Sequence, residues 1–182
     1  MIQSRRNFLR SAGLVAAAGA LTACTVTTSG KTTTLTLNTA KVKAYGQAGI
    51  NAVTTILSIT AVSTAMGAPA VAAIEAAGGA LSVSLSAFAS QTNGTLTVSY
   101  DNTDAKTRID TLLVDLNNAA VALRAGLVAA QQTVTSSVVT TAITTFNALL
   151  TVIDAFEGML GISLTSVTDT QEATALSTLA VK

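Results

Sequence analysis

The chain has 182 residues, enough for one ordinary domain, and carries a formal charge of +1 with only 10% charged and 3% aromatic residues. It has no histidine and one cysteine, which excludes Ser-His-Asp and Cys-His catalysis, a histidine-bound metal site and an internal disulfide. The nearly neutral charge argues against a nucleic-acid partner.

The N-terminus has the layout of an export signal. A positive segment holds Arg5, Arg6 and Arg10, and the uncharged apolar run 12–23 follows it. This run is too short for a relaxed membrane span, which needs about 20 residues. We therefore predict that residues 1–23 are a cleaved signal peptide.

The positive segment contains a paired-arginine motif. Ser4, Arg5, Arg6, Phe8 and Leu9 stand in the order Ser-Arg-Arg-Asn-Phe-Leu. This pattern resembles the leader of the bacterial twin-arginine translocation (Tat) pathway. The alternative interpretation is a generic positive segment for the Sec route, and both predict export.

The end of the leader reads Leu21, Thr22, Ala23 and Cys24. It resembles a bacterial lipobox, which implies that Cys24 becomes the first mature residue, receives acyl chains such as palmitate and anchors the protein to a membrane. Thr25 stands where an Asp would imply retention at the inner membrane, so the resemblance favours the outer membrane. The alternative is a chance cysteine beside an ordinary cleavage site.

The mature chain opens with a segment rich in Thr and Ser. Residues 24–37 have the composition of a tether between lipid and domain, and we predict that role for them. Their end, 34–37, alternates Thr and Leu in the manner of a short strand. Residues 95–100 show the same alternation after a turn signal at 91–94, so we predict that 32–37 and 95–100 pair.

Helical periodicity begins after Asn38. One apolar stripe runs over 39–66, Gly67 marks its end, and Pro69 suits the first turn of the next helix. That helix begins near residue 70, and we expect Gly78 and Gly79 to break or kink it. Residues 80–90 have apolar positions at both helix and strand spacing, and we prefer helix.

The C-terminal half predicts three further helices. They run to about residue 132 after caps at Asp101 and Asp104, over about 134–160, and from about 169 to the C-terminus. We therefore predict a mostly α fold in one domain, 38–182: a helical bundle of three to five helices with a small two-stranded β element. Four small residues on the apolar stripes would allow close helix approach: Gly49, Ala52, Ala119 and Ala120.

Three long stretches lack charge and could cross a bilayer by length. They are 44–74, 76–100 and 125–153. Each carries many Thr, Ser, Asn or Gln residues along a polar helix face, whereas a lipid-facing span is apolar on most sides. An integral helical membrane protein therefore stays an alternative, and a lipid-tethered bundle is preferred.

The candidates for chemistry are few. Asp101 and Asp104 are interpreted as helix caps, and Asp154 and Glu157 as a solvated face of one helix. The 101–104 loop lacks the register of a calcium site. Lysines in the central part of the chain lie in no Ser-x-x-Lys motif, and no glycine-rich phosphate loop follows a strand. We expect no catalytic residue, metal site or cofactor.

These observations favour a non-catalytic, lipid-anchored protein on the periplasmic side of the cell envelope. It would act by association with a protein partner or with itself, and low charge suits such contacts. One alternative is a carrier that holds an apolar ligand between its helices. Another is an enzyme that uses carboxylates or lysine.

Overall fold

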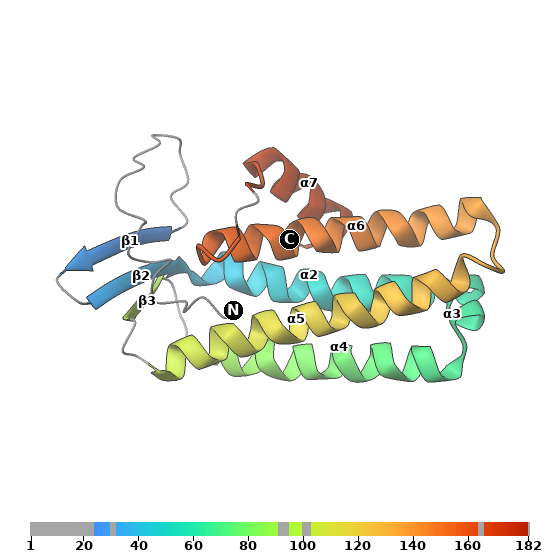
Figure 1. Ribbon diagram of the computed structural model, residues 1–182, viewed down its shortest axis with the longest axis horizontal. Coiled ribbons are helices and arrows are strands. Elements are labelled where there is room, and N and C mark those ends of the chain that lie inside the picture. Colours follow the sequence, from blue (N-terminus) through green and yellow to red (C-terminus); the bar gives the residue numbers. More distant parts are fainter. Residues whose placement is uncertain (1–23, 30–31, 91–94, 100–102, 164–165, 182) are drawn as a thin grey trace, which may run out of the picture.

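The computed structural model describes residues 24–29, 32–90, 95–99, 103–163 and 166–181. The body of the fold consists of four long helices: α2 (Thr39–Ser58), α4 (Ala68–Ala89), α5 (Thr103–Ala130) and α6 (Ser136–Met159). A small sheet lies at one end of this bundle, the short helix α3 (Thr60–Met66) lies at the other, and α7 (Asp169–Thr178) packs against α6 and α2 (Figure 1). The predicted mostly α bundle with a small β element is confirmed.

The sheet has three antiparallel strands in the order β1-β2-β3. They are β1 (Cys24–Ser29), β2 (Thr32–Asn38) and β3 (Thr95–Ser99). The predicted pairing of 32–37 with 95–100 is confirmed, with Leu35 opposite Val98 and Leu37 opposite Leu96.

Strand β1 was not predicted. It pairs with β2 from Cys24 opposite Leu37 to Ser29 opposite Thr32. Most of the segment 24–37, expected as a tether, is therefore part of the sheet. The physical reason is that threonine is β-branched and favours strands, a preference that outweighs low sequence complexity once a neighbouring strand is present.

Strand β2 leads directly into α2. The Asn38 side chain caps the helix, since its Oδ1 accepts from the backbone N–H groups of Ala40 and Lys41 at 3.0 and 3.2 Å. Leu37, the residue before the cap, is fully buried. The sheet is thus joined directly to the bundle at the capped start of α2.

The expected single helix over 39–66 is wrong, because the chain breaks at Ile59. Ile59 has φ −79° and ψ 91°, and α2 and α3 are bent by 89° at this point. The hydroxyls of Thr54 and Ser58 donate to carbonyls of their own helix, at Ile50 and Thr55, in a region rich in β-branched residues that favour helix weakly. After the bend, α3 buries Val62 and Met66 and covers the end of the bundle (Figure 1).

The connection from α3 to α4 matches the prediction. Gly67 has φ +80°, a conformation that glycine adopts without steric cost, and Pro69 lies in the first turn of α4. The expected break at Gly78 and Gly79 is wrong, since α4 continues through both. A Cβ at Gly78 would lie 3.0 Å from Val53 Cγ1, so the absence of a side chain at this position allows α4 to pack closely against α2.

Close packing around α2 holds the bundle together. A Cβ on Gly49 would lie 2.3 Å from Leu116 Cδ1 and 2.6 Å from Leu81 Cδ2. The other small residues predicted at helix contacts, Ala52, Ala119 and Ala120, are buried as expected. The large apolar side chains form one continuous core cluster that includes residues from every helix of the bundle.

Gly49 and Gly79 offer a matched pair of substitutions. We expect Gly49→Ala to lower the free energy of unfolding by about 1–3 kcal/mol, because the added methyl overlaps two leucines. Gly79→Ala, where nothing lies within 4 Å of the added Cβ, should raise it by about 0.5–1 kcal/mol through helix propensity. Urea denaturation followed by circular dichroism measures both, and stabilisation by both substitutions would contradict this account of α2.

Candidate functional site

The predicted export and lipidation residues lie at the start of the chain. Cys24 is the first residue of β1. The other residues of the two motifs lie outside the described part of the chain: Ser4, Arg5, Arg6, Phe8, Leu9, Leu21, Thr22 and Ala23.

The carboxylates singled out from the sequence do not converge on one site. Asp104 lies exposed in the first turn of α5, and Asp101 falls outside the described residues. Asp154 and Glu157 are partly exposed on α6, where Glu157 accepts a long hydrogen bond of 3.5 Å from Asn117. Among the residues that the structure describes, no group of three or more Cys, Asp or Glu could hold a metal ion.

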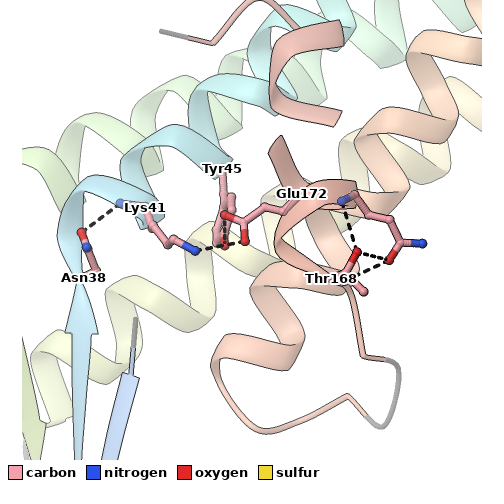
Figure 2. A network of polar contacts seen from close by, with 6 residues as sticks. Asn38, Lys41, Tyr45, Thr168 and Glu172 are labelled. Atoms are coloured by element: carbon pink, nitrogen blue, oxygen red, sulfur yellow. Dashed lines mark hydrogen bonds and ion pairs between the residues drawn. The ribbon is translucent and has the colours of Figure 1, made fainter. Parts of the chain in front are cut away.

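The clearest polar cluster joins α7 to α2. Glu172 Oε1 accepts from the Tyr45 hydroxyl at 2.9 Å, and Glu172 Oε2 pairs with Lys41 Nζ at 3.0 Å (Figure 2). The Glu172 side chain is only 12% exposed, against 33% for Lys41. The Tyr45 ring is buried and lies 5.4 Å from the Phe156 ring between their centroids.

Local sequence positions Glu172 for this contact. Thr168 and Gln171 form a capping box at the start of α7, in which Thr168 accepts from the Gln171 N–H and the Gln171 side chain accepts from the Thr168 N–H (Figure 2). At the other end of α7, Asn51 donates to the Leu179 carbonyl at 2.8 Å. Both ends of this short helix are thus bonded to α2.

This cluster is a structural attachment. Both carboxylate oxygens of Glu172 have protein donors, and the phenol and ammonium groups are engaged with the same residue. An isolated helix as short as α7 is marginal in water, so its order depends on such contacts and on the buried Ala175 and Leu179.

Sequence reasoning missed the burial of Glu172. Glu172 lies in the first turn of α7, where a negative charge interacts favourably with the positive end of the helix. The spacing of the sequence could have predicted this burial. Glu172 lies three, four and seven residues before Ala175, Leu176 and Leu179, so it shares their apolar face and its carboxylate points toward α2. Tyr45, expected at the edge of the core, is buried within it, and Tyr100 lies outside the described residues.

The outer face of α7 carries an open hollow rich in hydroxyl groups. It is lined by Asp169, Thr170, Ala173, Thr174, Ser177 and Thr178. The Thr174 and Thr178 hydroxyls donate to carbonyls of their own helix. The hollow is a surface feature of one helix and brings no second element toward a ligand.

Three helices are long and apolar enough to cross a membrane, judged by length and composition. They are α4, α5 from Lys106 and α6 from Ser137, and the bent pair of α2 and α3 would make a fourth. In the most apolar 18-residue segment of each helix, 28%, 44% and 44% of the residues, respectively, are buried inside the bundle. The largest fully buried side chains are Tyr45, Phe88, Phe156 and nine leucines and isoleucines.

The role of Glu172 can be tested with a second acid of the same helix as control. We expect Glu172→Ala to weaken α7 docking by about 2 kcal/mol, because two hydrogen bonds to a charged group are lost. Amides of α7 should then exchange with solvent roughly 30-fold faster. Asp169→Ala, at an exposed position of the first turn, should change exchange only a few-fold. Equal effects of the two variants would show that the buried carboxylate does not hold the helix.

Comparison with known proteins adds no relative to this chain: no protein-family model, curated protein or solved structure matches it.

Proposed function

We propose that this chain is a non-catalytic, lipid-anchored protein of the bacterial cell envelope, exported through the twin-arginine pathway and active through association with a partner or with itself. One observation carries the proposal. The only thiol in 182 residues is Cys24, at the position that a lipobox requires, directly after Leu21-Thr22-Ala23.

Acylation of Cys24 would supply stable attachment. Each buried methylene contributes about 0.8 kcal/mol, and one acyl chain alone binds a membrane only marginally, so two or more chains on one residue are needed. Because Cys24 pairs with Leu37 and β2 runs directly into α2, the attachment point lies at the sheet end of the bundle. In this proposal the sheet, rather than a flexible tether, sets the distance between the lipid and the helices.

The distribution of side chains favours a bundle that lies outside the bilayer. Helices that pack inside membranes use small residues at their contacts and turn large apolar side chains toward lipid. In this bundle leucine, isoleucine and aromatic side chains fill the interior. The exposed face of α6 instead carries polar residues such as Thr140, Thr144 and Asn147. This arrangement supports anchoring by lipid over insertion of helices.

The packing also favours association over carriage of a ligand between helices. The bundle interior is occupied by one continuous cluster of buried side chains, and close approaches such as Gly49 to Leu116 leave no separation between α2 and α5 at that point. The surface is weakly charged, with few lysines and acids to oppose contact with another protein. Association is therefore the activity that the geometry supports best.

Replacing the lipobox in the leader distinguishes anchoring by lipid from insertion of the helices into the membrane. We expect the native chain to fractionate with membranes. A chain whose residues 21–24 are replaced by an Ala-Xaa-Ala cleavage site, and whose twin-arginine segment is kept, should be processed and released as a soluble periplasmic protein. Fractionation and immunoblotting of the mature chain measure the difference.

Two controls complete this experiment. Cys24→Ser in the native leader should accumulate as a larger, unprocessed precursor, because the lipobox can no longer be acylated. If the Ala-Xaa-Ala variant is processed and still stays with membranes after carbonate washing, the helices themselves insert, and the proposal of a lipid anchor as the sole attachment fails.

A further inference from the structure

The outer face of α5 carries an unusual concentration of exposed valine. Six large apolar side chains stand out as exposed in the described part of the fold, and three of them lie on α5: Val114 (56%), Val121 (68%) and Val128 (54%). They recur every seven residues, so they lie on one side of the helix. The other three belong to other segments: Val83 lies on α4, Leu150 on α6 and Ile162 after the end of α6.

The residues between these valines complete a heptad pattern. Thr111, Asn118 and Ala125 alternate with Val114, Val121 and Val128 at spacings of three and four, and all six are exposed. We call these six residues the α5 stripe. It extends over roughly 25 Å of helix at 1.5 Å per residue. The same spacing forms the contact line of two-stranded coiled coils, in which a single Asn at the seam is common.

We propose that the α5 stripe is the surface through which two copies of this chain associate, with their α5 helices antiparallel. This inference rests on the association proposed above and identifies the partner as a second copy. A stripe that meets its own copy across a two-fold axis forms a self-complementary interface, the commonest arrangement in protein oligomers.

The charges beside the stripe select the antiparallel arrangement. On the side toward α6 the flanking residues are Asp110, Asn117 and Arg124, and Glu157 of α6 adjoins Asn117. Asp115 lies on the opposite side of the stripe. Asp110 forms an ion pair with Lys106 of its own helix, which leaves Arg124 and Glu157 as the opposite charges on the side toward α6. A parallel pair keeps Arg124 of one copy apart from Glu157 of the other along the helix axis.

An antiparallel pair instead gives opposite charges. With the two-fold axis near residues 118–121, Arg124 of each copy lies beside Asn117 of its neighbour, and Glu157 of that neighbour adjoins Asn117. Residues 118–130 hold no charge other than Arg124. The antiparallel arrangement therefore brings Arg124 of each copy toward Glu157 of the other.

The polar members of the stripe can be buried at small cost. The Thr111 hydroxyl already donates to the Thr107 carbonyl at 2.8 Å, so burial leaves no unpaired hydroxyl hydrogen. Asn118 lies next to the two-fold axis, where its amide can bond to the neighbouring copy. A contact of one helix pair is a small interface, so we expect weak association that shared attachment to a membrane strengthens. Two anchored copies in this arrangement require helices that lie along the membrane plane.

The proposal is tested with the full mature chain carrying Cys24→Ser, so that lipid plays no part. Sedimentation over about 5–500 µM should show a monomer–dimer equilibrium. Val121→Asp should weaken dimerisation at least tenfold, because it places two carboxylates near the axis. Val83→Asp is the matched control, since Val83 is 71% exposed and lies on α4, outside the α5 stripe. Both positions are exposed, so both variants should keep the circular dichroism spectrum and melting temperature of the parent.

Single cysteines test the orientation. In the Cys24→Ser chain, Asn118→Cys lies near the axis and should crosslink to its own copy, whereas Val128→Cys residues lie roughly 25 Å apart in an antiparallel pair and should not. A monomer at every concentration, or a dimer equally sensitive to Val121→Asp and Val83→Asp, would overturn the interface. Efficient crosslinking of Val128→Cys would overturn the antiparallel arrangement. None of these outcomes bears on acylation of Cys24, so the two proposals can fail separately.

Discussion

The close approach of α2 to its neighbours is the contact on which the rest of the fold depends. Gly46 and Gly49 leave room for leucine side chains from α4 and α5, and Val53 occupies the space beside Gly78. Helix α2 also receives the chain from the sheet at one end and holds α7 through Tyr45 and Lys41. Both the sheet and the C-terminal helix therefore contact the bundle through α2.

The surface of the bundle obtains its polarity mainly from hydroxyl groups rather than from charge. Several helical threonines outside the core donate to the carbonyl four residues earlier: Thr54, Thr111, Thr151, Thr174 and Thr178. A hydroxyl satisfied within its own helix loses little when another surface covers it, because the hydrogen bond persists. Such a surface is hydrated when exposed and can be covered at low cost. This property links the unusual composition to the association that we propose.

The sequence was sufficient for most of the helices and for one strand pair, because their signals are local, whereas the bend at Ile59 and the continuous course of α4 were not predicted. Periodic apolar positions, the Gly67-Ala68-Pro69 boundary and the Thr168 capping box all act within a few residues. The strand pair 32–37 with 95–100 could be predicted because both segments alternate in the same way. The rest depends on tertiary contacts. Strand β1 forms because it pairs with the edge of β2, and Gly78 allows α4 to lie close to Val53 of α2. Glu172 can be buried because α2 supplies hydrogen-bond donors to its carboxylate.

Acylation of Cys24 is the central claim, since export, attachment and the orientation of the bundle all follow from it. The most direct measurement is mass spectrometry of the N-terminal peptide of the protein purified from its native membranes. We predict a mature chain that starts at Cys24 and carries acyl groups on that residue. A peptide that starts at Met1, or a chain that starts at Cys24 with an unmodified thiol, would contradict the account.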